Sequence, residues 1–312
     1  MPGLAREISV VPSRAPCRSA ANARGARAER SGCAILPTGL GVPFRRVSIV
    51  ESLSLEPWVV ATPRLVHRLA ARPLGFRRDE LRWFDPMRLS STAFLDRLER
   101  LDELTFGPHG LRMPRWAFYD CVELPGALFG YAGSTRRFPE HVRGALPDDG
   151  ELWPLSMCMA TPMVRPDEWL VFSISSLLEL EPGTDSVRLG VETLALTLAA
   201  LGPKRAFGTM QWSSPSLAAH AHFAPLAVRA TWVPAHTHAG TCVFAFEPDA
   251  GRIEHALHAP LSTAGEGVVV DPEDQLALTA MQGRIEAGEK LSLVGATEAT
   301  REAKARVRWG RA

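Results

Sequence analysis

The sequence lacks most features of the common special classes of protein. It contains five cysteines in 312 residues, widely spaced and with no C-x-x-C pair. An odd, scattered set argues against a disulfide framework or a zinc finger and favours reduced thiols in the cytoplasm. No apolar run reaches the ~18 residues of a membrane span, and no charged segment precedes an apolar one as in a secretory signal. We therefore expect a cytoplasmic chain with no membrane span.

The chain also has no large excess of charge of either sign, since its net charge is +1. Residues 1–50 hold eight arginines and two acids, which leaves 27 basic and 32 acidic residues in the remainder. A mildly acidic body without a basic stripe lacks the electrostatic footprint for nucleic acid, so we expect no nucleic-acid partner. The Arg-, Ala- and Ser-rich segment 1–50 resembles a transit peptide, but a disordered leader is the favoured interpretation.

Several catalytic signatures are missing as well. The chain has no G-x-S-x-G, no Walker lysine loop, no H-E-x-x-H and no G-x-G-x-x-G. The chain therefore lacks the key residues of α/β hydrolases, of P-loop enzymes and of dinucleotide-binding enzymes. What is present is 46% apolar residues, enough to bury a sizeable core.

The periodic segments predict one α+β domain over 80–250, after an irregular lead-in at 51–79 and before a partly helical extension at 251–312. An amphipathic helix follows Ser91, because apolar residues from Phe94 to Leu104 recur at three-and-four spacing. Further helices are expected over 186–202 and 216–223. A β-hairpin is expected over 115–133, turning at Pro125-Gly126, and single strands over 80–89, 152–164, 168–180, 205–212, 226–236 and 241–249.

This order of elements resembles the GNAT N-acetyltransferase fold, a mixed and mostly antiparallel sheet flanked by helices. In that family a motif after the fifth strand reads Asn, two residues, Ala, three residues, Tyr, three residues, Gly-Phe. The stretch "SSPSLAAHAHFAP" matches this spacing without a gap, although most identities differ, at Ser213, Ser216, His220, Ala224 and Pro225. The resemblance implies an acyltransferase that takes acetyl-CoA or another acyl-CoA as co-substrate and an amine as acceptor.

The resemblance also implies where acyl-CoA binds. The fourth strand of the family and the helix after it hold pantetheine and pyrophosphate, which here places pantetheine along Ser173, Ile174, Ser175 and Ser176. The family's phosphate motif, Gln or Arg, two residues, Gly, one residue, Gly or Ala, falls in "TDSVRLGVE". The expected cofactor-binding residues are therefore Ser173, Ile174, Ser175, Ser176, Ser186, Arg188, Gly190 and Ser213. Asp185, at the Gln/Arg position, opposes an anion.

His220 is the candidate catalytic acid, at the position of the family's Tyr. An ordinary histidine pKa near 6.5 would leave it partly protonated near neutrality. A backbone N–H near Ile174 would stabilise the oxyanion. The general base stays open between Glu168, Glu123 and a water held by serines.

Two other functions remain open. The altered phosphate motif favours a non-catalytic ligand- or partner-binding protein of the same fold. His236 and His238 would face one side of a strand and, with His220 or His222, could bind zinc or nickel. No carboxylate follows His238 at a suitable distance, so no metal site is predicted.

Overall fold

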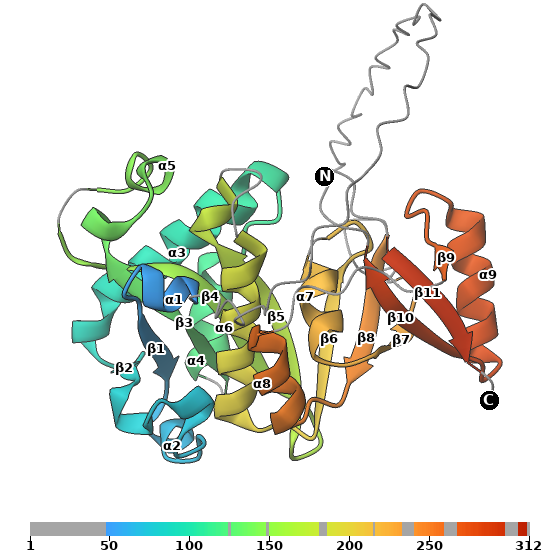
Figure 1. The fold of residues 1–312 in the computed structure, drawn as a ribbon, viewed down its shortest axis with the longest axis horizontal. Coiled ribbons are helices and arrows are strands. Elements are labelled where there is room, and N and C mark those ends of the chain that lie inside the picture. The colour runs from blue at the N-terminus through green and yellow to red at the C-terminus, as the bar shows by residue number, and fades with distance from the viewer. Residues whose placement is uncertain are drawn as a thin grey trace, which may run out of the picture. The chain divides into compact units, whose positions relative to one another are not determined.

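A single mixed sheet organises the part of the chain that the structure describes. This computed structural model describes residues 48–123, 126–147, 150–180, 186–214, 216–232, 240–258, 267–296 and 305–310. The strand order is β2-β1-β3-β4-β5-β6-β8-β7-β10-β11-β9 (Figure 1). The strands are β1 (Glu56–Ala61), β2 (Arg82–Phe84), β3 (Ala127–Ser134), β4 (Leu152–Pro162), β5 (Glu168–Ser176), β6 (Arg205–Gln211), β7 (Leu226–Ala230), β8 (Thr241–Phe246), β9 (Val268–Val269), β10 (Lys290–Ala296) and β11 (Ala305–Gly310).

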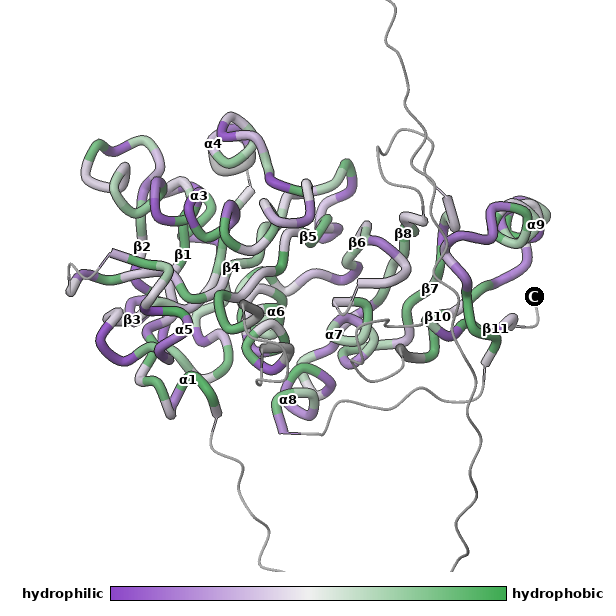
Figure 2. The backbone as a smooth tube through the Cα atoms, turned by 90° about the horizontal axis from the view of Figure 1, so that it is seen from above, coloured by the Kyte–Doolittle hydropathy of each residue, from purple (hydrophilic) through white to green (hydrophobic). Residues whose placement is uncertain are grey.

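Helices cover both faces of this sheet. They are α1 (Ile49–Ser52), α2 (Pro63–Val66), α3 (Thr92–Phe106), α4 (Arg115–Glu123), α5 (Glu140–Arg143), α6 (Ser186–Leu201), α7 (Ser216–Phe223), α8 (Ala250–His258) and α9 (Gln275–Glu286). Figure 2 shows α3 and α4 on one side of the strands and α6 and α8 on the other. Because α6 packs against β3, β4 and β5 as well as α7 and α8, nearly all of its described residues are buried, as a helix that is apolar all round requires.

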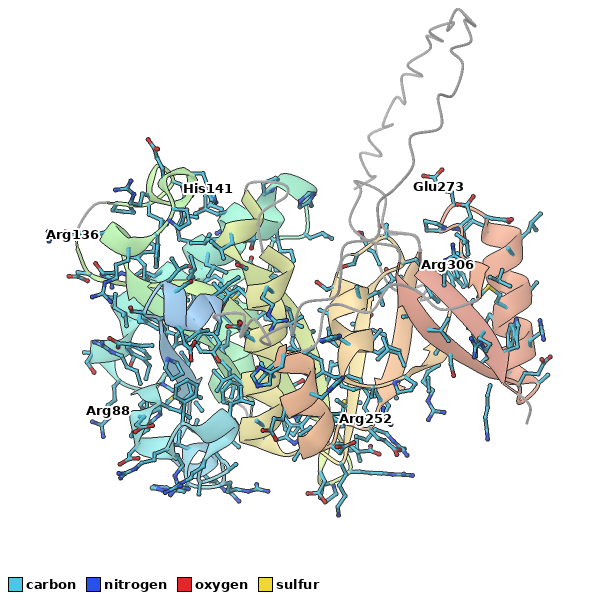
Figure 3. All side chains as sticks on the ribbon, in the orientation of Figure 1. Arg88, Arg136, His141, Arg252, Glu273 and Arg306 are labelled. Carbon is cyan, nitrogen blue, oxygen red and sulfur yellow. The ribbon has the colours of Figure 1, made fainter. Side chains whose placement is uncertain are left out.

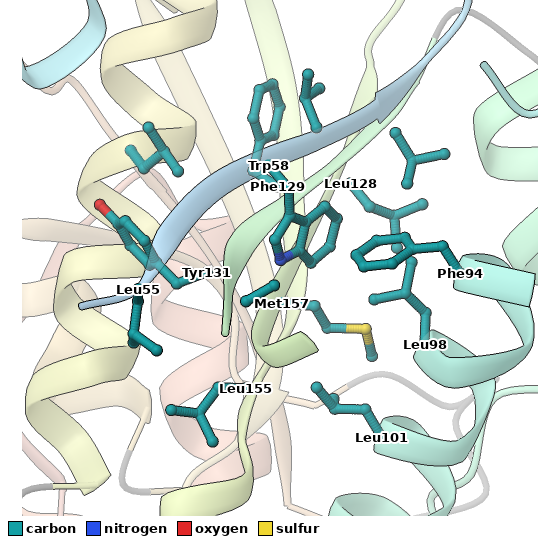
Figure 4. Packing of buried hydrophobic residues seen from close by; sticks show 14 of the residues in the cluster. Leu55, Trp58, Phe94, Leu98, Leu101, Leu128, Phe129, Tyr131, Leu155 and Met157 are labelled. Carbon is teal, nitrogen blue, oxygen red and sulfur yellow. The ribbon is translucent and has the colours of Figure 1, made fainter. Parts of the chain in front are cut away.

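The core beneath α3 is built around Trp58 of β1. Its ring meets Phe94 of α3 edge to face, with ring centroids 5.2 Å apart, and both side chains lie among buried leucines (Figure 4). Gly130 of β3 makes room for this indole. A Cβ atom at Gly130 would lie 2.6 Å from the Trp58 ring and 2.0 Å from the carbonyl oxygen of Ser156. This contact admits no side chain at residue 130.

Most of the predicted elements are present, and three predictions were wrong. The lead-in at 51–79 is not irregular, since it contains β1, an interior strand paired with β2 and β3. The predicted strand at 80–89 shortens to β2, three residues at the sheet edge. The hairpin expected over 115–133 is the helix α4 followed by β3, because Phe118 is buried while Trp116 stays 66% exposed, a helical and not an alternating pattern.

The two ends of the chain also differ in detail from expectation. The leader predicted for 1–50 lies outside the described residues up to 47, while Val50 of α1 is buried in the core. Beyond residue 250 the sheet continues, because β10 pairs with β7, β11 with β10, and β9 with β11. The continuous sheet therefore has strands on both sides of residues 80 and 250. None of the described helices has the length and apolarity that a membrane crossing requires.

Candidate functional site

The site begins where two parallel strands separate. β5 and β6 pair over three residue pairs, from Glu168 with Arg205 to Leu170 with Phe207, and their pairing ends there. β5 continues to Ser176 and stays paired with β4 on its other edge, while β6 continues to Gln211 and stays paired with β8. Unpaired strand edges present backbone N–H and C=O groups to whatever enters the gap.

A bulge in β5 lies at this point. The register with β4 shifts between Met157 and Met159, so that Met159 pairs with Phe172 and Met157 with Ser175. Ser173, inside the bulge, has a φ angle of 51°. A non-glycine residue in the left-handed region is uncommon and costs about 1–3 kcal/mol when surrounding structure imposes it. The bulge turns this part of β5 and its side chains out of the regular pleat.

A cavity of about 320 Å³ occupies the gap between the two strands. Side chains from β5, β6, α7, β8 and the end of α3 line it. They are Phe106, Leu111, Phe172, Ser173, Ile174, Thr209, Met210, Gln211, Ser214, Ser216, His220 and Thr241. The lining combines apolar residues with uncharged polar ones, which suits a ligand with amide or hydroxyl groups on an apolar frame.

His220 lies in this cavity, fully buried and fixed in orientation. Its Nδ1 lies 2.8 Å from the carbonyl oxygen of Ser216, so in the neutral ring Nδ1 carries the proton and donates it. Its Nε2 is buried without a hydrogen-bond partner among the described residues. Burial lowers the pKa of His220 to about 4, and the ring packs against Phe244 and Phe246. The expected partial protonation near neutrality therefore does not hold, because the ring is desolvated and the described lining of the cavity contains no acid.

Polar residues of β6 and β8 were missed by sequence reasoning. The Oγ1 atom of Thr209 is buried in the cavity wall without a partner among the described residues. The Oγ of Ser175 in β5 also lacks a partner among those residues, but it does not line the cavity. Unsatisfied buried hydroxyls are rare and often mark a place for a ligand or an ordered water. The available signal was the alternation of Thr209 and Gln211 on a strand that leads directly to the His220 helix.

Only two of the four residues expected along the pantetheine line the cavity. Ser173 and Ile174 line the cavity, whereas Ser175 and Ser176 are fully buried and do not. The Oγ of Ser176 accepts a hydrogen bond from the N–H of Leu178 at the end of β5. Ser213 is exposed in the turn after β6 and does not line the cavity.

The expected phosphate site lies at the start of α6. Ser186 begins this helix, and Gly190 faces β5, since a Cβ there would lie 3.7 Å from Ile174. Arg188 points toward the buried Glu192, with its Nε 3.7 Å from a carboxylate oxygen. The other oxygen of Glu192 accepts a hydrogen bond from the hydroxyl of Ser48, and burial raises the pKa of Glu192. The guanidinium of Arg188 is thus already ion-paired with the carboxylate of Glu192.

The remaining candidate residues lie elsewhere. Glu168 is at the closed end of the strand pair, 3.6 Å from Arg205, and does not line the cavity. His222 turns away from His220 toward α8, with its Nε2 2.7 Å from the carbonyl oxygen of Ala256. His236 and His238 lie outside the described residues, and within those residues no three metal-ligating side chains come together.

A second, larger cavity of about 550 Å³ lies between α7, α8, β10 and β11. Its lining includes His222, Arg252, His255 and Arg308 but none of the expected catalytic or cofactor-binding residues. Arg252 is ion-paired with Asp249 at 3.0 Å and lies at the molecular surface (Figure 3). The cavity between β5 and β6 is therefore the candidate functional site.

Fold and site together define a mixed α/β protein with a large, mostly antiparallel sheet and a cavity at a parallel strand pair. No protein-family model and no curated protein matches the sequence. An aminoglycoside 6'-acetyltransferase type Ii is similar in structure, with a TM-score of 0.35 and 12% identity over 53% of this chain and 94% of that one. A domain from Methanocaldococcus jannaschii DSM 2661 has a TM-score of 0.32 and 10% identity over 52% and 94%. Similarity at this level carries no argument about activity.

Proposed function

We propose that this chain is an acyl-CoA-dependent N-acyltransferase that transfers an acetyl or longer acyl group directly to an amine. The observation that carries the proposal is the separation of β5 from β6 with His220 in the resulting cavity. The order β1-β3-β4-β5-β6-β8-β7 resembles the GNAT sheet, in which acyl-CoA binds where the fourth and fifth strands diverge. Counted from β1 and without the short edge strand β2, those strands are β5 and β6.

The cavity suits the pantetheine arm of acyl-CoA. That arm is an uncharged chain of amides, and the unpaired edge of β5 around Ser173 offers backbone groups to such a chain as a neighbouring strand would. In this proposal the arm lies along Ser173–Ser176 with Ser213 near its path, and a backbone N–H near Ile174 stabilises the oxyanion. The buried hydroxyl of Thr209 would gain the hydrogen bond that it lacks among the described residues.

His220 would move the proton during the reaction. Its Nε2 holds a lone pair at rest, so it first accepts a proton from the attacking amine and then donates that proton to the departing thiolate. The acid role expected for His220 thus follows an earlier step as a base. The hydrogen bond from Nδ1 to Ser216 keeps Nε2 in the reactive orientation.

The phosphates of acyl-CoA would lie at the start of α6, near Ser186, Arg188 and Gly190. N-terminal N–H groups of a helix favour an anion, and this helix is sixteen residues long. Arg188, which is ion-paired with Glu192, would have to interact with a phosphate as well. This competition supports the alternative candidate, a non-catalytic ligand-binding protein of the same fold, in which acyl-CoA or a related molecule binds but is not turned over.

Calorimetry with acetyl-CoA tests the proposal, followed by an assay of thiol release in the presence of a primary amine. We expect saturable heat and amine-dependent release of CoA. Ser214→Trp, which fills the cavity, should abolish the heat, whereas Leu276→Trp, at an exposed position of α9, should retain it. Binding without release in the presence of any amine would favour the non-catalytic alternative. No heat from acetyl-CoA or a longer acyl-CoA would overturn both.

A further inference from the structure

The cavity between β5 and β6 contains no charged side chain among its described lining residues. Five of those residues are apolar, six are uncharged polar residues, and the twelfth is His220. None of the residues labelled in Figure 3 is among the residues that line this cavity. Desolvating an ammonium without a carboxylate partner is strongly unfavourable, so such a cavity selects against a cationic ligand.

The side of the cavity formed by the end of α3 is apolar. Phe106 is the last residue of α3, and Leu111 lies in the connection to α4. This connection is held in place from inside the protein, because the buried carboxylate of Asp102 accepts a hydrogen bond from the N–H of Met113 at 2.8 Å. The molecule that meets this wall therefore contacts a phenyl ring and a leucine side chain, which favour an apolar body.

His220 is too weak a base to take a proton from an alkylammonium acceptor. Burial holds its pKa at about 4, whereas an alkylammonium such as that of lysine titrates near 10.4. Proton transfer between them is uphill by about six pKa units, roughly a million-fold. An acceptor that already carries a free lone pair at neutral pH avoids this step.

We propose that the acceptor is a weakly basic amine on an apolar body, such as an aromatic amine, and that it enters the cavity uncharged. The inference rests on the proposed acyltransferase function and specifies its substrate class. The amine nitrogen attacks the thioester carbon and forms the C–N bond, and Nε2 of His220 takes one proton from that nitrogen. The C–S bond then breaks and the thiolate receives this proton, which leaves an amide and free CoA.

The test compares aniline with cyclohexylamine, two amines of the same ring size that differ in basicity. Acetyl-CoA binding is first measured by calorimetry, and kcat/KM is then measured for each amine by thiol release between about pH 6.5 and 8.5. We expect aniline to have the higher kcat/KM at neutral pH and to show little pH dependence. Cyclohexylamine should gain about tenfold per pH unit, as its uncharged fraction does.

Gln211→Glu extends the test by adding a carboxylate of the same shape to the cavity lining. It should raise kcat/KM for cyclohexylamine and lower it for aniline, while Gln275→Glu, at an exposed position of α9, should change neither. Thermal melting confirms that both variants fold. If acetyl-CoA binds and cyclohexylamine is preferred at neutral pH, or if Gln211→Glu leaves the ratio unchanged, this inference is overturned and the acyltransferase proposal stands. Absence of acetyl-CoA binding would overturn both.

Discussion

The imidazole of His220 donates its Nδ1 proton to the carbonyl oxygen of Ser216, one helical turn earlier in α7. This 2.8 Å contact determines which ring nitrogen is free, because a carbonyl can only accept. The free Nε2 is buried without a hydrogen-bond partner among the described residues, and His220 lines the cavity between two diverging strands. His220 is thus held by its own helix as a neutral proton acceptor.

Replacing His220 by phenylalanine should separate binding from turnover. His220→Phe keeps the ring volume against Phe244 but removes Nε2, so kcat should fall by about 10²-fold or more with little change in acetyl-CoA affinity. His222→Phe, on the same helix but directed at α8, serves as the matched control and should retain kcat. Calorimetry and thiol release measure the two quantities, and equal kcat values for both variants would remove His220 from the mechanism.

His220 should also make the chain less stable in acid. Its folded pKa of about 4 lies below its usual 6.5, so the folded state binds fewer protons than the unfolded state. Its contribution to the free energy of unfolding is present above about pH 6.5 and is lost as the pH falls toward about 4, by up to about 3 kcal/mol. Urea denaturation of the parent chain and His220→Phe at several pH values measures this difference. A constant difference across that range would contradict the prediction.

Asp102, by contrast, should make the chain less stable as the pH rises. Burial raises its pKa to about 6 from 3.8, so the folded state binds more protons and the stabilising contribution is lost as the pH rises through about 6. Asp102→Asn keeps an acceptor for the N–H of Met113 without the charge. Its free energy of unfolding relative to the parent should increase by about 1–3 kcal/mol between about pH 4 and pH 7.5. Asp96→Asn, on the exposed side of α3, is the matched control in urea denaturation, because it makes the same acid-to-amide change outside the core.

Gly130 should tolerate no side chain. In Gly130→Ala the new Cβ would lie 2.0 Å from the Ser156 carbonyl oxygen, and a paired strand backbone cannot move away cheaply. We expect a loss of about 2–3 kcal/mol or more in the free energy of unfolding. Gly283→Ala, in α9 with open space around it, should be neutral or stabilising by up to about 1 kcal/mol. Thermal and urea denaturation compare the two, and similar stabilities would disprove the packing argument.

The sequence predicts the helices better than the first half of the sheet. Strong periodicity identifies α3 and α6, because each must bury a continuous stripe or a whole surface. β1 escapes detection because Pro57 lies within its six residues and Pro63 follows shortly after them, and because the strand has no alternating pattern, being buried on both faces. α4 is mistaken for a strand because its apolar residues are adjacent and a Pro-Gly pair follows.

The site is predictable only where a local spacing encodes it. The spacing from Ser213 to His220 leads to the histidine that the structure places in the cavity. The other wall residues come from segments about forty to one hundred residues apart, such as Phe106, Phe172 and Thr209, which only the folded sheet brings together. The protonation of His220 also depends on burial, which no spacing reveals.

The open half of β6 has a strand partner on one side alone. Residues 208–211 pair with β8, β8 pairs with β7, and β7 pairs with β10 of the hairpin at 290–310. The second wall of the cavity is thus connected through β8 and β7 to β10 and β11, none of whose described side chains lines the cavity. We therefore expect a change that weakens the pairing of β7 with β10 to alter the width of the cavity, although no described side chain of β10 lines it.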